Sequence, residues 1–388
     1  MQERLVRRFK DEAVAVYSIE GEKQPEDFRR YVVSTRSTRD LSNYPEIINR
    51  DFTNLMQNGI TNGLKGINLL ERISEINSKS VNVYHLLRGG LNFNVSDALK
   101  KAFGYKWHSS SYLSSQRVLK EGRFEVSDDY YRKFVVPDDA TVYTADIVAS
   151  GVSIENGIDY IYKYMQSNGH NLKNFFFLTI GCIEAERVLA RWHKIFKDTF
   201  PGYGETLVVY LEGRFGLATA QTPFANKLVY TDLIKSYKEG ALLAPEYEHS
   251  QFDKVITALE ACAIYDGGKK GFEPINHIKD ILEFWEKQHA SAVAADWSTW
   301  QEYNLRFPLD MYFTDIEKLT PGSGALLRER KAPMWEGVTD DEYSRLHARF
   351  SWLWTPERIR RSGEPGSFAR ECEKKIAYLS SLVAGTSA

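Results

Sequence analysis

Between residues 81 and 250, short apolar runs alternate with segments in which apolar residues recur at helical spacing. Four apolar runs predict buried strands at residues 81–87, 142–148, 175–180 and 206–211. Amphipathic stretches between them predict helices, most clearly at 154–165 and 184–196. Because strands that are joined through helices run parallel in one sheet, we predict an α/β fold with a mostly parallel sheet flanked by helices.

The two flanking regions show a different pattern. Residues 1–80 predict an N-terminal helical segment that packs on the core, with the clearest helical spacing at 68–78. Residues 251–388 hold six of the eight tryptophans and predict a mainly helical C-terminal domain of unknown role, with helices at 252–263 and 278–288. A single core stops growing at roughly 250–300 residues, so a chain of 388 residues suits this division, with 81–250 as the α/β domain.

Composition narrows the class of protein. Hydrophobic residues make up 43% and charged residues 26%, as in soluble globular proteins, and the net charge of −2 gives no overall attraction to nucleic acid or to an anionic membrane. We expect neither a signal peptide nor a membrane partner, since no long apolar run occurs. Cys182, Cys262 and Cys372 lack the spacing of a zinc site, which predicts reduced thiols and a cytoplasmic location.

The most informative segment runs from Asp146 to Ser153 (DIVASGVS), where a predicted strand ends, a turn with one glycine follows and a helix begins. Backbone N–H groups of such a turn converge with the positive end of the helix, which favours a phosphate group. The hydroxyls of Ser150 and Ser153 are additional donors. Asp146 stands at the carboxyl end of its strand, where open α/β sheets bind ligands. A plain serine-capped helix is the competing interpretation.

A second turn, Arg88-Gly89-Gly90, follows the earlier strand at 81–87. A glycine pair lets the backbone approach a diphosphate closely, and an arginine offers two parallel donors to phosphate oxygens. A tight turn with a surface arginine would give the same pattern. Two such turns in this order, each after a strand, favour a site for a phosphorylated ligand.

Together the two turns resemble the ligand loops of type I phosphoribosyltransferases, and the chain is most similar to uracil phosphoribosyltransferase-like proteins over roughly residues 60–215. The family signature is an apolar strand, two acidic residues, three mostly apolar residues and Thr/Ser-Gly-x-Thr/Ser. Asp146 matches the second acid and 150–153 match the end, whereas Ala145 stands where the first acid is expected. The resemblance implies phosphoribosyl pyrophosphate as donor, a nucleobase-like small molecule as acceptor, and Mg²⁺ as cofactor.

The resemblance also implies a role for each matching residue. Arg88, Gly89 and Gly90 would bind pyrophosphate, and Asp146 would hold the ribose hydroxyls. The 5′-phosphate would be held by five consecutive residues of the turn: Ala149, Ser150, Gly151, Val152 and Ser153. In uracil-type members a mobile loop with an arginine precedes a Tyr-Tyr-x-Lys segment. The polar stretch 107–122 would supply Arg117 to close the site over the leaving group, and Lys133 of the segment 130–133 (YYRK) would support it.

The expected base-binding motif of uracil enzymes, Pro-Gly-x-Gly-Asp-x-Gly-Asp, is only partly matched, by Pro-Gly-Tyr-Gly-Glu at 201–205. Residues 212–216 (EGRFG) are a second candidate for the lining of the acceptor pocket, so the acceptor base stays open. His85 and His108 are candidates for a general base by position only, because most histidines in such elements are structural, and His193 is interpreted as structural.

The predicted function is therefore a phosphoribosyltransferase that releases pyrophosphate, with Asp146 and Arg117 as catalytic residues. A second hypothesis is a non-catalytic regulator that senses the donor or a nucleotide and binds nucleic acid through 358–361 (RIRR), although a solvated helix face is the commoner meaning of such a cluster. The sequence is also compatible with an enzyme that uses a different donor or acceptor, and with an interaction protein that has no ligand. We expect a homo-oligomer, because dimers are common for the implied fold and among soluble oligomers in general.

Overall fold

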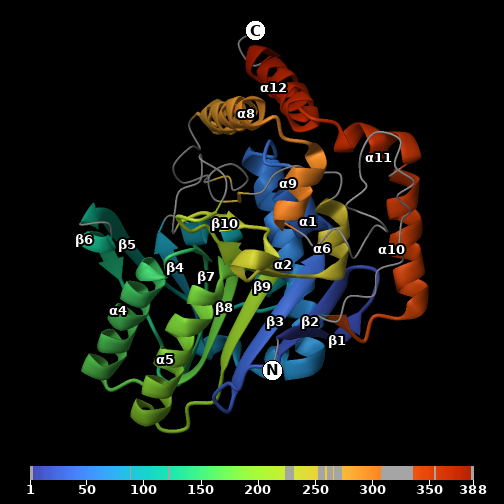
Figure 1. The fold of residues 1–388 in the computed structure, drawn as a ribbon. Coiled ribbons are helices and arrows are strands. Elements are labelled where there is room, and N and C mark those ends of the chain that lie inside the picture. The colour runs from blue at the N-terminus through green and yellow to red at the C-terminus, as the bar shows by residue number, and fades with distance from the viewer. Residues whose placement is uncertain are drawn as a thin grey trace.

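The computed structural model describes residues 3–87, 89–120, 123–222, 231–251, 258–259, 265, 273–306, 335–353 and 355–385. One mixed sheet organises them (Figure 1). Its strands, in spatial order, are β12 (Trp335–Glu336), β1 (Arg4–Lys10), β2 (Val14–Glu20), β3 (Phe28–Thr35), β9 (Thr206–Leu217), β8 (Leu172–Cys182), β7 (Ala140–Val148), β4 (Val81–Leu87), β5 (Ser109–Lys120) and β6 (Arg123–Lys133). The short strands β10 (Leu233–Ile234) and β11 (Leu242–Leu243) pair with β9.

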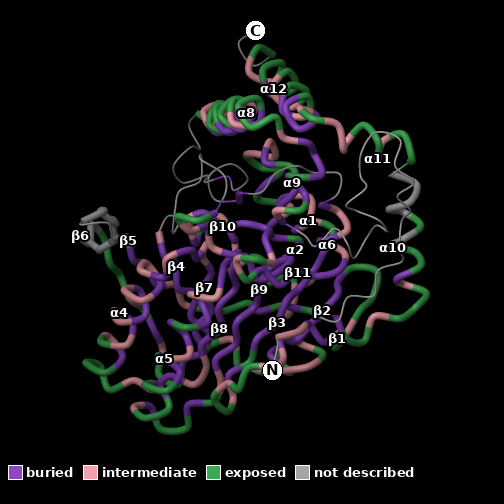
Figure 2. The backbone as a smooth tube through the Cα atoms, in the orientation of Figure 1, coloured by how far each residue is buried: buried purple, intermediate pink, exposed green. Residues whose placement is uncertain are grey.

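The four predicted strands form the centre of this sheet. β9, β8, β7 and β4 are adjacent and mutually parallel, and β3 and β5 extend the parallel part on either side. Antiparallel pairing occurs toward the edges, between β1, β2 and β3 and between β5 and β6, so the whole sheet is mixed. The central strands are buried along nearly their whole length (Figure 2), as expected for parallel strands that are covered on both faces.

Helices cover the sheet in two groups. α2 (Asn49–Glu71) and α3 (Val95–Phe103) pack on each other and on β2, β3 and β7, with α1 (Arg36–Asn43) beside α2. α4 (Val152–Asn168) and α5 (Ile183–Thr199) pack on each other and on β4, β8 and β9. α4 buries one apolar stripe at the spacing that the sequence predicts: Ile154, Ile158, Ile161 and Met165.

The prediction of a helical segment over residues 1–80 is wrong for its first half. Residues 4–35 form β1, β2 and β3, which extend the sheet beyond β9. A short apolar run such as Val14–Glu20 fits a strand or a buried helix equally well, and its pairing with distant segments decides between them. The helix predicted at 68–78 is the end of α2, which stops at Glu71 because Arg72 adopts a left-handed conformation with φ of 51°.

The described part of the C-terminal region is mainly helical, as predicted. Its described helices include α8 (Ile275–Ala295), which contains the predicted 278–288, with α9 (Thr299–Arg306), α10 (Asp340–Leu353), α11 (Pro356–Gly363) and α12 (Ser367–Gly385). Most of the helix predicted at 252–263 lies outside the described residues, and Ala258 within it forms a β-bridge with Ile234.

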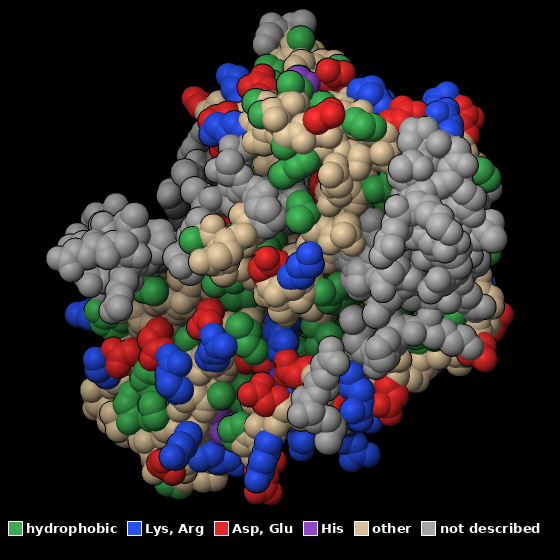
Figure 3. Space-filling view, viewed as in Figure 1, with side chains coloured by type: hydrophobic (Ala, Val, Ile, Leu, Met, Phe, Trp, Pro, Cys, Tyr) green, Lys and Arg blue, Asp and Glu red, His purple; other side chains and the backbone are tan. Residues whose placement is uncertain are grey.

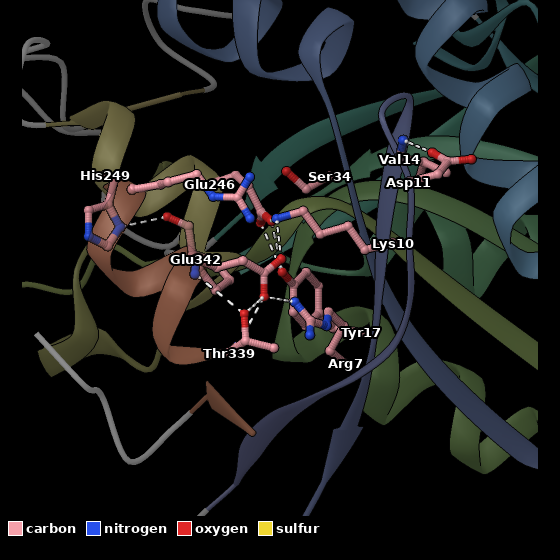
Figure 4. A network of polar contacts seen from close by, with 12 residues as sticks. Arg7, Lys10, Asp11, Val14, Tyr17, Ser34, Glu246, His249, Thr339 and Glu342 are labelled. Atoms are coloured by element: carbon pink, nitrogen blue, oxygen red, sulfur yellow. Dashed lines mark hydrogen bonds and ion pairs between the residues drawn. The ribbon is translucent and has the colours of Figure 1, made fainter. Parts of the chain in front are cut away.

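The boundary predicted near residue 251 does not separate two independent domains, because β12 from the C-terminal region pairs with β1 in the sheet. Ion pairs also join the β1–β2 hairpin to α6 (Pro245–Ser250) and α10 (Figure 4). Lys10 Nζ lies 2.7 Å from Glu246 Oε1 and 3.1 Å from Glu342 Oε1, and Arg7 pairs with Glu342. Burial raises the pKa of Glu342, but hydrogen bonds from Arg7, the Thr339 N–H and Lys10 outweigh it and lower that pKa to about 2.

A second charged network lies inside the sheet layer. Arg30 on β3 places Nη1 at 2.7 Å from Glu186 Oε2 and at 2.6 Å from Glu3 Oε1. Arg214 on β9 lies 3.2 Å from Glu186 Oε1 and also pairs with Glu3. Both arginines and Glu186 are buried. The four groups therefore link β3, β9, the start of α5 and the N-terminus through charges that have little contact with water.

Within the described part of the chain, no helix is both long enough and apolar enough to cross a membrane.

Candidate functional site at the carboxyl ends of the central strands

The fold brings the two predicted turns to the same edge of the sheet. β4 and β7 are neighbours, with His85 opposite Ala145, so the turns that follow them emerge side by side. A Cβ atom built on Gly89 would lie 2.4 Å from Asp146 Oδ1, and one on Gly90 would lie 2.9 Å from the Ala145 carbonyl oxygen. At Gly90 the neighbouring atom belongs to the backbone and cannot move aside, so only glycine fits there, whereas at Gly89 the neighbouring atom is the tip of a side chain that would have to shift. Arg88, predicted to bind pyrophosphate, lies outside the described residues.

Asp146 is held at the end of β7 in a defined position. Its side chain is half-buried, and its Oδ1 accepts a hydrogen bond of 2.8 Å from the Ile147 N–H. The Asp146 carbonyl oxygen accepts a bond of 2.8 Å from Thr179 Oγ1 on β8. A carboxylate fixed in this way beside a glycine turn is suited to accept hydrogen bonds from the hydroxyl groups of a ligand.

The second turn has the geometry of an anion site. Gly151 has φ of 78°, the left-handed conformation that glycine favours. α4 begins at the next residue, and because its N-cap is a glycine, no side chain caps the first N–H groups of the helix. Among the described residues, the Ser150 Oγ atom is buried and has no hydrogen-bond partner. A buried hydroxyl without a partner costs free energy, so a ligand that accepts its hydrogen bond would remove that cost. Ala149, Ser150 and Gly151 thus lie in the turn, whereas Val152 and Ser153, which were predicted to belong to it, are the first two residues of α4.

Two residues of the neighbouring elements β8 and α5 hold this turn from behind. Cys182, at the end of β8, donates its thiol to the Ala149 carbonyl oxygen at 3.1 Å. Burial raises the pKa of Cys182 to about 12, so the thiol keeps its proton and remains a donor. Val188 of α5 would lie 3.1 Å from a Cβ atom on Gly151. No local pattern indicates these contacts, because they depend on how β8 and α5 pack on the turn.

A groove of about 460 Å³ between α4 and α5 touches the outer side of the turn at Ser150–Val152. Its lining includes Glu155, Asp159 and Glu184, and the Glu155 carboxylate accepts a hydrogen bond of 3.0 Å from Trp192 Nε1. The described lining of the groove carries these three carboxylates and one arginine, Arg191, which pairs with Glu155, so the net charge of the lining is negative and disfavours a phosphate.

Arg117 and Lys133 lie on a β-hairpin, not in a loop. The prediction that 107–122 is a polar mobile segment is therefore wrong for 109–120, which form β5, because cross-strand pairing with β6 satisfies the backbone of this serine-rich stretch. Leu87, the last residue of β4, pairs with Ser114, and Arg117 is three residues farther along β5. Its backbone therefore lies roughly 10 Å beyond the end of β4, toward the side of the glycine turn. Nothing is described of the Arg117 side chain.

Lys133 is exposed and pairs with Tyr112 at the base of the hairpin. Tyr112 pairs in turn with His85, and His85 with Ala145, so Lys133 begins a row of residues that crosses the sheet to β7. The structure thus brings Gly89, Gly90 and Asp146 together and keeps Lys133 apart on β6, which β5 separates from β4 and which β5 and β4 separate from β7.

The candidate histidines are in structural positions. His85 is only 7% exposed and stacks on Tyr112 with ring centroids 4.9 Å apart. Burial and the nearby His108 lower the pKa of His85 to about 4, so it is neutral at pH 7. His108 Nε2 lies 3.1 Å from Ser96 Oγ. His193 is within 2.9 Å of both Thr206 Oγ1 and the Glu26 carbonyl oxygen, which confirms its structural role.

The prediction that residues 212–216 line an acceptor pocket is wrong for their two charged side chains, because both are buried in contacts within the protein. Glu212 caps the start of α1, where its carboxylate accepts hydrogen bonds of 2.6 Å from Ser34 Oγ and 2.8 Å from the Thr35 N–H. Burial raises the pKa of Glu212 to about 7, and the lowering effects of Arg39, Ser34, Thr38 and the Thr35 N–H only partly oppose it. Arg214 belongs to the buried network with Glu186 and Glu3.

The described residues include no group of three or more His, Cys, Asp or Glu that could hold a metal ion. Cys182 and Cys372 are free and buried, and Cys262 lies outside the described residues.

No protein-family model matches the chain, and no curated protein matches it. Solved structures do match in part. The protein AQ2163 from Aquifex aeolicus has 12% identity and a TM-score of 0.33 over 47% of this chain and 88% of its own. Adenine phosphoribosyltransferase from Trypanosoma brucei, solved with AMP, pyrophosphate and ribose 5-phosphate, has 12% identity and a TM-score of 0.28 over 47% of this chain and 83% of its own.

Hypoxanthine phosphoribosyltransferase from Trypanosoma cruzi, solved with the product IMP, also has 12% identity, with a TM-score of 0.22 over 52% of this chain and 86% of its own. At these scores the matches carry no argument about the fold, the ligand or the activity of this chain. The functional inference therefore depends on the geometry of the strand ends and on the sequence motifs.

Proposed function

We propose that this protein is a phosphoribosyltransferase that moves ribose 5-phosphate from phosphoribosyl pyrophosphate to a nucleobase-like acceptor and releases pyrophosphate. One observation carries the proposal: the Gly89–Gly90 turn lies directly against Asp146, on the strand next to it. Two turns that are more than fifty residues apart in the chain thereby lie at one edge of the sheet, as a ligand with phosphate groups at both ends of a ribose requires.

Each part of this edge, called the strand-end site below (Gly89, Gly90, Asp146 and residues 149–153), has a proposed role. The Gly89 and Gly90 N–H groups, with Arg88, bind pyrophosphate. The turn at 149–153 binds the 5′-phosphate through its backbone and the Ser150 hydroxyl, at the positive end of α4. Asp146 accepts hydrogen bonds from the ribose hydroxyls. Arg117 closes over the leaving group from the tip side of the β5–β6 hairpin, whereas Lys133, which lies on β6 away from the glycine turn and Asp146, has no role in this proposal.

In the proposed reaction, a nitrogen lone pair of the acceptor forms a bond to C1 of the ribose. The bond from C1 to the pyrophosphate oxygen breaks, and its electron pair leaves with pyrophosphate. The acceptor nitrogen gives its proton to solvent, because the described histidines near the site are buried or bound elsewhere. Positive charge develops on the ribose ring, so positioning of the reactants and stabilisation of the leaving group supply most of the catalysis.

The strand-end site fits Mg²⁺ only as a complex with the donor. Asp146 is a single hard oxygen ligand, and the described residues contain no cluster of carboxylates that could hold the ion alone. Mg²⁺ commonly binds through one or two carboxylates together with substrate phosphates, which suits this arrangement. The ion would supply charge neutralisation of the pyrophosphate, and Asp146 is the protein group that would contact it.

Calorimetric titration of phosphoribosyl pyrophosphate with Mg²⁺ tests the proposal on wild type, on Asp146→Asn and on a matched control, Asp159→Asn. Asp159 lies on α4 and pairs with Lys163 at 2.6 Å, in the outer groove. We expect saturable binding that Asp146→Asn weakens about tenfold or more and Asp159→Asn leaves unchanged. Absence of saturation at millimolar donor, or equal effects of the two variants, would remove the assignment.

A donor-sensing regulator remains the second candidate, because one observation favours it. Ala145 occupies the position of the first family acid, and an alanine has no carboxylate that could bind the ribose hydroxyls. Its side chain is also buried. Measurement of pyrophosphate release with a panel of nucleobases separates the two functions. Release with at least one base supports the enzyme, whereas tight donor binding without release on any base supports the regulator. The predicted homo-oligomer is part of either proposal and is tested by analytical ultracentrifugation.

A further inference from the structure

A cavity of about 770 Å³ lies in the C-terminal region where α9, α11 and α12 meet. Hydrogen bonds fix the three helices around it. Trp300 Nε1 donates to the Ile359 carbonyl oxygen at 2.9 Å and joins α9 to α11. The Thr299 N–H donates to Ser367 Oγ at 2.8 Å and joins α9 to α12, and Ser367 Oγ donates to the Ser362 carbonyl oxygen at 2.8 Å. We call this the helix-corner cavity. Its walls are held by buried contacts and not by exposed side chains alone.

Basic side chains outnumber acidic ones in the described lining of the cavity. The basic residues are Arg358, Arg360, Arg361, Arg370 and Lys374. The acidic residues are Glu357, Glu364 and Glu371. Five positive and three negative charges give the lining a net charge of +2, whereas the whole chain has −2. The cavity is thus a local positive site on a weakly negative protein, and Figure 3 shows Lys and Arg beside Asp and Glu in the region of α11 and α12.

The ion pairs in the cavity are of a kind that a ligand can replace. Glu364 is shared by Arg360, at 2.7 Å, and Arg370, at 3.0 Å, although these two arginines come from different helices. Their side chains are 43% and 52% exposed. Exposed ion pairs contribute little to stability, so exchange of the carboxylate for a phosphate costs the fold little. Arginine side chains present two parallel donors that match phosphate oxygens.

We propose that the helix-corner cavity binds a small molecule with two or more linked phosphate groups, of the size of a nucleotide. Its volume lies within the usual range for small-molecule sites, about 300–1,000 Å³. Arg360 and Arg370 converge on one point, which Glu364 occupies in this structure, and that point is the expected position of a phosphate. The cavity is formed by helices other than those of the strand-end site, so the inference does not depend on the proposed function.

A nucleic acid is the less favoured ligand. Recognition of a duplex or of a long single strand requires a continuous basic surface, whereas acidic side chains alternate with the basic ones in this cavity. The cavity is a partly exposed corner of three helices, and its size suits a compact anion.

The test is calorimetric titration of the full chain with inorganic tripolyphosphate and, separately, with ATP. The variants are the double substitution Arg360→Gln with Arg370→Gln, and Glu364→Gln. Arg345→Gln serves as a surface control, because Arg345 pairs with Asp341 on α10 outside the cavity. Circular dichroism of each variant checks that the helices are retained.

We expect Arg345→Gln to bind polyphosphate with the affinity and stoichiometry of wild type. Any equivalent that binds at the strand-end site should keep its affinity in the cavity variants, which separates it from the equivalent bound in the cavity. The double arginine substitution should weaken binding by at least about tenfold. Glu364→Gln should tighten binding, because it removes the competing carboxylate from both arginines. Equal affinity for tripolyphosphate and ATP indicates recognition of the phosphates alone, and tighter binding of ATP indicates that the nucleoside is recognised as well. Either supports the proposal.

Two results would overturn it. One is absence of saturation at millimolar polyphosphate, or binding that the cavity variants do not change. The other is binding of single-stranded RNA that strengthens with length and displaces ATP, which would identify a nucleic-acid surface instead.

Discussion

The strand-end site and the helix-corner cavity are both suited to phosphate, but they are made from different parts of the chain. The strand-end site consists of the backbone turns that follow two adjacent strands, β4 and β7. Gly89 and Gly90 belong to the first turn, and Asp146 and the Ser150 hydroxyl lie beside the turns. The helix-corner cavity consists of long, half-exposed side chains from α11 and α12. Binding at the strand-end site depends on the path of the backbone and hence on the sheet beneath it. Binding in the helix-corner cavity depends on charged side chains that can be substituted without disturbing the fold.

The largest expected effect tests how far the strand-end site depends on the sheet. Arg214→Ala removes one arginine of the buried network and leaves Glu186 and Glu3 with less compensation. Breaking a buried ion pair typically costs about 3–5 kcal/mol of unfolding free energy. Urea denaturation measures the change. The control Arg345→Ala removes an exposed pair on α10 and should cost less than about 1 kcal/mol. Similar values for the two variants would show that the buried network does not support the sheet.

The unfolding free energy should depend on pH through Glu212, which is fully buried, unlike the partly exposed Glu364 of the helix-corner cavity. The folded-state pKa of Glu212 is raised to about 7 from its ordinary value of 4.5. The folded protein therefore keeps a proton that the unfolded chain releases, and the resulting stabilisation is complete below pH 4.5 and is lost as the pH rises to about 7. The loss amounts to about 3 kcal/mol.

Glu212→Gln should reduce this fall in unfolding free energy between pH 4.5 and 7, as measured by urea denaturation at several pH values. Burial also raises the pKa of Glu205 to about 7, with the same sign, so part of the slope should remain. Glu336→Gln, an exposed residue of β12, is the control and should leave the slope unchanged. An unchanged slope in Glu212→Gln would contradict the assignment.

An intermediate effect is expected for Gly90→Ala at the strand-end site. The added Cβ would lie 2.9 Å from the Ala145 carbonyl oxygen, and a backbone atom cannot rotate away from it. Overpacking of this kind costs about 1–3 kcal/mol and should shift the turn enough to abolish donor binding. Thermal unfolding and donor titration measure the two effects. Gly385→Ala, which has no atom within 4 Å of its new Cβ, is the control. Unaltered donor binding in Gly90→Ala would show that the turn does not contact the ligand.

The smallest effect is expected for Glu364→Gln in the helix-corner cavity. Its carboxylate is 29% exposed and its two arginine partners are about half-exposed, so the unfolding free energy should change by less than about 1 kcal/mol. Chemical denaturation checks this. A loss of several kcal/mol would mean that Glu364 is a structural anchor of α11 and α12, and the contrast between the two sites would then disappear.

Patterns of neighbouring residues were sufficient to predict the central strands, the turns that follow them and α4. The apolar runs at 81–87 and 142–148 predicted β4 and β7, and the glycines that follow predicted turns at their carboxyl ends. The stripe of Ile154, Ile158 and Met165 predicted α4. These features are local, because a strand, a turn and a helix start are encoded by residues within a few positions of one another.

Further features could not be predicted because they depend on contacts between distant segments. Residues 4–35 form strands because β3 pairs with β9, and 109–120 form a strand because they pair with β4 and β6. Glu212 and Arg214 were interpreted as residues of a pocket, whereas packing against α1, α5 and the N-terminus buries them. Such pairing and burial have no signature in a single short window.

The sequence by itself therefore determined the parallel strands, the two glycine turns and the identity of Asp146 as a residue at a strand end. Only the tertiary structure decided that Gly89 lies against Asp146, that Cys182 and Val188 hold the second turn, and that arginines of α11 and α12 share one carboxylate. The physical reason is that local backbone conformation follows from neighbouring residues. The convergence of side chains from separate elements follows only from how those elements pack.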